Sequence, residues 1–263
     1  MDLGLVGKRA FVSGSTQGIG FAVAEALLAE GASVVVNGRT EDGVAAAVRR
    51  LGEAVPGAAV SGVAADFAEP DQVRRLLETL GEVDVLVNNV GVFDVQAFEE
   101  VSDDEWRRYV DVNVMSGVRL SRHVLPGMLS RGWGRVVFVG SESGVNVPAD
   151  MIHYGTTKGA ALALANGLAK LTRGTDVTVN TVLGGPTYSD GVARAVEDLS
   201  RARGVPTGQV RSAIEASNRT SLLQRFIEPV EIAHLVAYLA GSGSSATNGA
   251  ALRADGGVLT TTL

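Results

Sequence analysis

A tyrosine and a lysine stand four residues apart, at Tyr154 and Lys158, in a segment whose composition predicts a helix. Residues i and i+4 share one face of a helix, and a nearby positive charge lowers the pKa of a phenol from about 10. Thirteen residues before Tyr154, Ser141 ends a predicted strand, where its hydroxyl can bond a substrate oxygen. These residues predict acid–base chemistry at a carbonyl or alcohol oxygen. The segment is no Gly-x-Ser-x-Gly elbow, because Glu142 occupies the position of the nucleophile.

A glycine-rich loop follows the first predicted strand and precedes a predicted helix. Glycines permit a tight turn and a close approach of phosphates, and a helix N-terminus offers free N–H groups and a positive dipole end. The spacing is GxxxGxG rather than GxGxxG, and no lysine follows the last glycine, which excludes a P-loop. We expect a diphosphate-binding loop; the alternative is a turn needed only for packing. Its residues are Gly14, Ser15, Thr16, Gln17, Gly18, Ile19 and Gly20.

The end of the second predicted strand bears on the choice of dinucleotide. An acidic residue there would bind the adenine ribose 2′-hydroxyl of NAD, and none is present. Arg39 and Thr40 instead suit a 2′-phosphate, because a guanidinium binds phosphate oxygens strongly. We therefore expect NADP(H) to be favoured over NAD(H). A solvated arginine is the alternative, and Gln17 supplies no second basic contact.

Short β-branched runs alternate with helical patterns along the whole chain. This alternation predicts an α/β fold, with residues 1–263 forming a single Rossmann-type domain. Its doubly wound parallel sheet should have about seven strands with helices on both faces, because the runs are apolar throughout. The predicted strands are residues 10–13, 33–37, 58–63, 83–88, 135–140, 177–183 and 250–253, and the predicted helices are 21–30, 40–51, 69–81, 103–131, 151–173 and 228–240.

The segment between the sixth and seventh predicted strands is longer than one crossover helix needs, at about 65 residues. Its first part, residues 186–225, is predicted to form a lid over the substrate, because ligands bind at the carboxyl ends of the strands in this architecture. A surface excursion without a role is the alternative.

Composition excludes several classes of protein. The 263 residues carry 23 basic and 29 acidic side chains, a net charge of −6, which argues against a nucleic-acid binder. Cysteine is absent and the three histidines are far apart, so neither disulfides, thiolate catalysis nor a metal site is expected. No apolar run is long enough to cross a membrane and the opening residues show no signal peptide, so a cytoplasmic location is expected.

Taken together, these motifs resemble the short-chain dehydrogenase/reductase family over essentially the whole chain. Gly14, Gly18 and Gly20 match its cofactor loop, and residues 88–91 (Asn-Asn-Val-Gly) match its NNAG segment with Val for Ala. The remaining matches are Asp66, Asn113, Ser141, Tyr154, Lys158 and the closing Asp255-Gly256-Gly257. One departure is Gly184, which replaces the proline of the family's Asn-x-x-x-Pro-Gly turn.

The resemblance implies hydride transfer between a nicotinamide and a carbonyl or alcohol carbon. Tyr154 would be the general acid or base, Lys158 would hold the ribose, Ser141 would orient the substrate oxygen and Asn113 would fix a water. The implied cofactor-binding residues are Gly14, Ser15, Thr16, Gln17, Gly18, Ile19, Gly20, Arg39, Thr40, Asp66, Phe67, Asn88, Val90, Gly91, Tyr154, Lys158, Gly185 and Thr187. A homo-oligomer, either dimer or tetramer, is also implied.

The substrate should be a small molecule, a neutral ketone or secondary alcohol, with ketone reduction favoured. The expected lining is mostly apolar and offers no arginine for a carboxylate: Phe93, Val145, Val147, Ile152, Leu183 and Tyr188. An NAD-dependent alcohol or sugar dehydrogenase is the main alternative. A catalytically silent cofactor-binding scaffold is a second alternative, although all four catalytic positions are filled.

Overall fold

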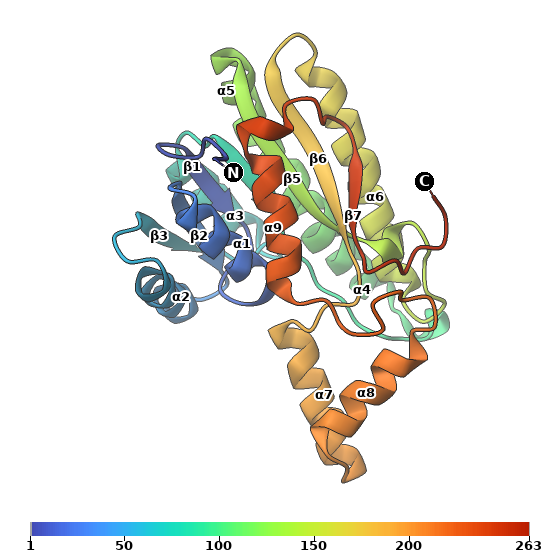
Figure 1. Cartoon of the computed structure of the whole chain (residues 1–263). Helices are drawn as coiled ribbons and strands as arrows, with labels where there is room; N and C mark the ends of the chain where they lie inside the picture. Colours follow the sequence, from blue (N-terminus) through green and yellow to red (C-terminus); the bar gives the residue numbers. More distant parts are fainter. Residues whose placement is uncertain (1, 263) are drawn as a thin grey trace.

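Seven parallel strands form one sheet in the order β3-β2-β1-β4-β5-β6-β7. The structure is a computed structural model that describes residues 2–262. This architecture confirms the predicted single-domain, doubly wound α/β fold with about seven strands (Figure 1). The strands are β1 (Arg9–Val12), β2 (Ser33–Gly38), β3 (Val60–Ala64), β4 (Val85–Asn88), β5 (Trp133–Ser141), β6 (Asp176–Gly184) and β7 (Ala251–Ala254).

Helices cover both faces of the sheet, as the predicted crossovers require. Helices α1, α2 and α9 contribute to one apolar cluster, and α3, α5 and α6 contribute to the other. The helices are α1 (Gly18–Ala29), α2 (Glu41–Ala54), α3 (Pro70–Leu80), α4 (Asp103–Val110), α5 (Ser116–Arg131), α6 (Ile152–Ala169), α7 (Asp190–Arg203), α8 (Thr207–Ser217) and α9 (Pro229–Ala240). Short 3₁₀ turns are η1 (Phe98–Glu100), η3 (Glu142–Gly144), η4 (Lys170–Thr172) and η5 (Ser242–Ser244).

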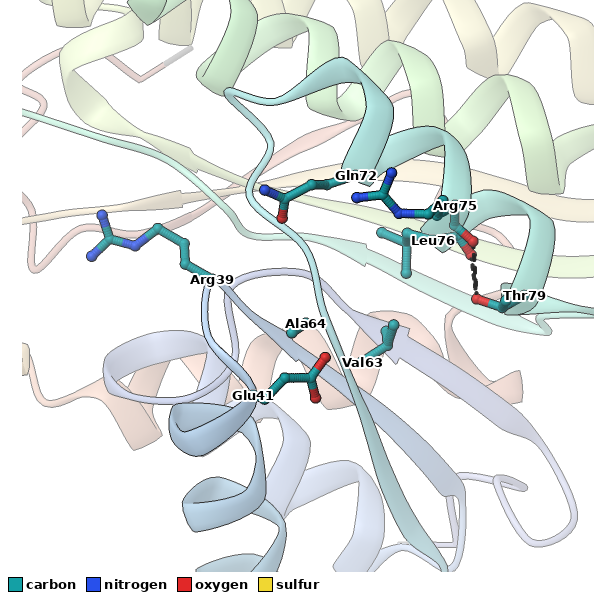
Figure 2. Close-up of a pocket in the computed structure, with 8 residues that line it drawn as sticks. All are labelled: Arg39, Glu41, Val63, Ala64, Gln72, Arg75, Leu76 and Thr79. Carbon is teal, nitrogen blue, oxygen red and sulfur yellow. Dashed lines mark hydrogen bonds between the residues drawn. The ribbon is translucent and has the colours of Figure 1, made fainter.

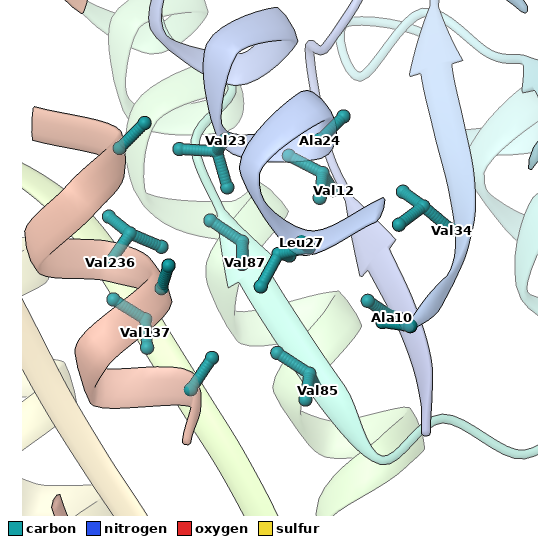
Figure 3. Packing of buried hydrophobic residues seen from close by; sticks show 14 of the residues in the cluster. Ala10, Val12, Val23, Ala24, Leu27, Val34, Val85, Val87, Val137 and Val236 are labelled. Atoms are coloured by element: carbon teal, nitrogen blue, oxygen red, sulfur yellow. The ribbon is translucent and has the colours of Figure 1, made fainter. Parts of the chain in front are cut away.

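Successive strand residues point to opposite faces and both faces are buried. On β1, Val12 packs in the cluster that holds Leu27 of α1 and Val236 of α9 (Figure 3). The preceding residue, Phe11, belongs to the opposite cluster with Leu76 of α3. Burial on both faces is what produces near-continuous apolar runs in the sequence of a parallel sheet.

The predicted helix over residues 103–131 is helical throughout but not uniformly α-helical. A π-helical turn, η2 (Asp111–Met115), separates α4 from α5 and contains Asn113. Single π turns inside α-helices are frequently found at functional sites. The predicted helix over 151–173 is divided between α6 and η4.

The long segment before β7 folds as two helices followed by a third. Helices α7 and α8 contact each other and form a V that projects beyond the carboxyl edge of the sheet, whereas α9 packs against the sheet (Figure 1). Within the described residues, none of the helices is long and apolar enough to cross a membrane.

Candidate active site

The predicted site residues meet at the carboxyl edge of the sheet. Asn88 ends β4, Ser141 ends β5 and Gly184 ends β6, and these three strands are neighbours. The glycine loop follows β1, which is paired with β4. Because all strands are parallel, residues that are distant in sequence converge at one edge, where ligands bind in open α/β sheets.

Tyr154 and Lys158 lie in the first two turns of α6, and Tyr154 hydrogen-bonds Ser141. The Lys158 ammonium donates to the Val139 carbonyl at 3.0 Å and lies 5.7 Å from the centre of the Tyr154 ring. Phe93 approaches the other side of the phenol edge-on, with ring centres 6.2 Å apart. The structure therefore brings three of the four predicted catalytic side chains together.

The pKa of Tyr154 differs from the sequence-based expectation. Burial raises the pKa of this phenol to about 12; the hydrogen bond with Ser141 lowers it and the charge of Glu142 raises it further. Burial also lowers the pKa of Lys158 to about 8, and the Glu142 carboxylate opposes that change. The pKa of Tyr154 is thus raised rather than lowered, because the loss of solvent around the phenol outweighs the hydrogen bond with Ser141.

Asn113 is the fourth predicted catalytic residue, and its amide joins a loop to a helix. The side-chain oxygen accepts from the Val92 N–H at 2.8 Å, and the NH₂ donates to the Val92 carbonyl and to Thr157 Oγ1, both at 3.0 Å. These bonds tie the loop after β4 to helix α6. A methyl group on Gly91 would lie 3.4 Å from Asn113 Oδ1 and 3.6 Å from Lys158 Nζ. Glycine therefore keeps space open over both polar groups.

Side chains from β2 and from the residues directly after β1 and β4 hold the glycine loop. Ser13 Oγ accepts from the Asn89 and Val90 N–H groups at 2.9 and 3.0 Å. The Asn89 amide donates to the Ser13 and Gly14 carbonyls at 2.9 and 2.8 Å. Asn37 is buried, and its oxygen accepts from the Gly14 N–H at 3.0 Å. Asn37 therefore supports the loop from β2.

The N-terminus of α1 fits an anionic group. Gln17 occupies the cap position without capping the helix through its side chain. The Gly18 N–H donates to the Asp190 carboxylate at 2.6 Å, and Arg194 hydrogen-bonds the Gln17 side chain. The first N–H groups of a helix have no acceptor within the helix. An external carboxylate already bound there shows that this end accepts negative charge, as a diphosphate site requires.

A cavity of about 380 Å³ lies between the ends of β2 and β3 and helix α3. Figure 2 shows Arg39 at its rim and Gln72 and Arg75 on the opposite wall. The Gln72 side chain accepts from the Asp66 N–H at 3.0 Å, which fixes the loop after β3. Glu41 also lines this cavity, so its wall carries a carboxylate as well as the guanidinium groups of Arg39 and Arg75.

Other residues that were predicted to bind the cofactor make hydrogen bonds or packing contacts within the protein. Thr40 Oγ1 caps α2 by accepting from the Gly43 N–H at 3.2 Å. Phe67 is 2% exposed and packs in the core, so only its backbone can meet a cofactor. The Asn88 side chain is buried against Ser121 of α5, and Thr187 Oγ1 donates to the Gly185 carbonyl at 2.8 Å. Ser15 is buried as well, where its hydroxyl donates to the Val12 carbonyl.

Several residues that shape the site were not assigned a role from the sequence. Asn37, Gln72 and Asp190 depend on contacts across the fold, so no local signal marked them, whereas Asn89 was noted only as part of the segment 88–91. Glu142 did have a signal, because it is an acid directly after the predicted catalytic serine. No three His, Asp or Glu side chains within residues 2–262 form a cluster that could hold a metal ion.

Comparison with known proteins shows the family to which the chain belongs. Residues 8–200 match the family model described as short chain dehydrogenase. The uncharacterized oxidoreductase YvrD of Bacillus subtilis is 42% identical, over 98% of this chain and 99% of its own. Two solved structures are also similar. L-sorbose reductase from Gluconobacter frateurii, complexed with NADPH and L-sorbose, has 31% identity and a TM-score of 0.93, with 99% and 100% of the two chains covered.

The second structure is a point variant of actinorhodin polyketide ketoreductase with NADPH. It has 32% identity and a TM-score of 0.86, and the alignment covers 95% of this chain and 97% of that one. The family model spans most of the chain, and the relatives match it from end to end. The chain therefore belongs to the short-chain dehydrogenase/reductase family and is an oxidoreductase of CH–OH or C=O groups.

Proposed function

We propose that this enzyme reduces a neutral ketone to a secondary alcohol with NADPH, and that Tyr154 supplies the proton. The observation that carries the proposal is the meeting of Ser141, Tyr154 and Lys158 beside the glycine loop. The similar sorbose reductase and polyketide ketoreductase were both solved with NADPH, which supports the cofactor and the direction.

Tyr154 is suited to give a proton at neutral pH. Its pKa of about 12 keeps the phenol protonated, and a protonated phenol is the form that a general acid needs. NADPH, which the glycine loop and Lys158 would hold, would supply the hydride to the carbonyl carbon, and negative charge would then develop on the carbonyl oxygen. Tyr154 gives its proton to that oxygen, and Ser141 holds the oxygen in place by a hydrogen bond.

Lys158 compensates the negative charge that this proton transfer leaves on the phenol oxygen. A pKa of about 8 keeps most of the ammonium charged at pH 7, so it stabilises the tyrosinate and binds ribose hydroxyls. Asn113 acts as a positioning residue in this proposal, because its three hydrogen bonds join the loop at Val92 to α6.

The preference for NADPH is assigned to Arg39. Its side chain is exposed at the rim of the 380 Å³ cavity, where it can meet a 2′-phosphate. A hydrogen bond to a charged group contributes about 1.5–3 kcal/mol, so Arg39→Ala should weaken NADPH binding roughly 10- to 100-fold. NADH affinity should stay within about twofold, and Arg49→Ala, on the exposed side of α2, is the matched control.

The decisive experiment compares Tyr154→Phe with the wild type. Fluorescence titration should show that both proteins bind NADPH, because the glycine loop and Arg39 are unchanged in the variant. Ketone reduction should fall at least about 100-fold, the scale of general-acid catalysis. Unchanged turnover by Tyr154→Phe would assign the proton to another group.

Residues 186–225 are assigned to a lid that closes over the substrate. The base of the α7–α8 hairpin adjoins the glycine loop through the Gly18–Asp190 and Gln17–Arg194 contacts. Tyr188, at the start of the hairpin, packs on Phe226 at its end, with ring centres 5.5 Å apart. A hinge that touches the cofactor loop suits a lid that responds to cofactor binding.

A further inference from the structure

Glu142 places a carboxylate directly beside the hydroxyl that orients the substrate oxygen. It follows Ser141 and begins the turn η3. Its Oε2 accepts from Ser141 Oγ at 2.5 Å, and its Oε1 accepts from Ser143 Oγ at 3.2 Å. The side chain is half-buried, and its charge raises the pKa of both Tyr154 and Lys158. Its field therefore reaches both reacting groups, although the proposed reduction gives it no role.

Ser141 can donate only one hydrogen bond at a time through its hydroxyl group. A serine hydroxyl has one hydrogen to donate, and in the structure Ser141 gives it to Glu142. When Ser141 turns its hydrogen toward a ketone oxygen, Glu142 Oε2 loses that donor. A partly buried charged acceptor without a donor is costly. A ketone that carries a hydroxyl on the adjacent carbon brings a replacement donor to the same place.

Resting on the proposed function, we propose that Glu142 is the specificity-determining residue that selects neutral ketones with a hydroxyl on the carbon next to the carbonyl. The substrate hydroxyl donates to Glu142 Oε2 while Ser141 donates to the carbonyl oxygen. That hydroxyl keeps its proton and none of its bonds changes, so the hydride and the Tyr154 proton still complete the reduction.

The same carboxylate selects against acidic substrates. A carboxylate two bonds from the reacting carbonyl would lie near Glu142, and like charges in a half-buried site repel with little screening. The enzyme should therefore discriminate against β-keto acids and in favour of hydroxyketones of the same length.

Matched substrates test this directly. Hydroxyacetone and 2-butanone differ by a hydroxyl in place of a methyl group, and acetoacetate carries a carboxylate there. The measurement is kcat/KM for each with NADPH, for the wild type, Glu142→Gln, Glu142→Met and the control Glu53→Met on exposed α2. We expect the wild type and Glu53→Met to prefer hydroxyacetone about 10- to 100-fold, the value of a charge-assisted hydrogen bond.

In Glu142→Met the kcat/KM values for hydroxyacetone and 2-butanone should become about equal, chiefly because the value for hydroxyacetone falls. Glu142→Gln keeps an acceptor oxygen without the charge, so it should retain part of the preference and reduce acetoacetate better than the wild type does. It should also shift the pH profile of alcohol oxidation to lower pH, because the charge that raises the pKa of Tyr154 is gone. A residue that only supports the turn η3 would move neither readout.

Two outcomes overturn the inference while the proposed function stands. One is a wild type that reduces 2-butanone as efficiently as hydroxyacetone. The other is an unchanged preference in both Glu142 variants, with NADPH titration showing that they are folded. If the wild type binds NADPH but reduces neither ketone, the proposed function fails and this inference fails with it.

Discussion

Gly20, the last glycine of the cofactor loop, offers a sharp test of how the loop is built. A methyl group at this position would lie 2.4 Å from the Gly14 carbonyl oxygen, 2.5 Å from Asn89 Nδ2 and 2.9 Å from Ser15 Cα. Ordinary van der Waals contact begins at 3.4 Å, so the backbone of the loop must move by about 1 Å in Gly20→Ala. Two of the three neighbours are backbone atoms, which cannot rotate away as a side chain would.

The cost follows from this clash. Overpacking of a well-packed interior costs about 1–3 kcal/mol, which for a chain of this size lowers Tm by roughly 2–12 °C. The same movement displaces the N–H groups of α1 that we assign to the diphosphate. A misplacement of about 1 Å can cost roughly 100-fold in function, so we expect NADPH affinity to fall by at least about tenfold.

Differential scanning fluorimetry and NADPH titration measure the two effects on the same samples. The control is Gly52→Ala in α2, where a methyl group meets nothing within 4 Å. Alanine there should raise stability by about 0.5–1 kcal/mol through its better helix propensity, without changing NADPH affinity. A Gly20→Ala protein with wild-type Tm and wild-type affinity would refute the close packing of the loop.

Three further outcomes are expected. Asp190→Ala removes the carboxylate at the Gly18 N–H, so trypsin should cleave the α7–α8 hairpin faster; equal cleavage rates would argue against a tethered lid. Because the pKa of Lys158 is about 8 in the folded protein and 10.5 without the influence of the fold, the unfolded chain binds more protons between these values. The stability of the cofactor-free wild type should therefore rise with pH over pH 8–10 relative to Lys158→Met, as measured by urea unfolding. Arg225 holds the pKa of Glu231 near 2, so this pair stabilises the fold above about pH 4.5 and is lost toward pH 2; Glu231→Gln should flatten that part of an acid-unfolding curve.

The sheet was predictable because its pattern is local. A strand buried on both faces must be apolar along its length, so Val34–Val36 marks β2 without any tertiary information. The catalytic segment was also predictable, because the four-residue spacing of Tyr154 and Lys158 fixes a shared helix face. What the pattern left out was the pKa of Tyr154, which depends on burial by residues from other elements.

Hydrogen bonds between residues that are distant in the sequence could not be predicted from the sequence. Asn89 and Asn37 hold the glycine loop from β4 and β2, more than twenty residues away in sequence. The lid was predicted from the length of the segment and its place at the carboxyl edge of the sheet, and the contact of this predicted lid at Asp190 came only from the folded chain. Polar side chains of this kind carry no periodic signal, since their hydrogen-bond partners lie far away in the sequence.

The π-helical turn at residues 111–115 acts as a phase shift between two helical registers. One extra residue in a turn rotates everything after it by about 100° relative to an unbroken α-helix. Tyr109, before the turn, packs against His153 of α6, whereas Leu120, after it, packs in the sheet core. Deleting one residue here would therefore turn one helix about its axis and separate Asn113 from Val92. The number of residues between α4 and α5 is thus fixed, as well as their identity. Insertions should be accepted only outside this turn.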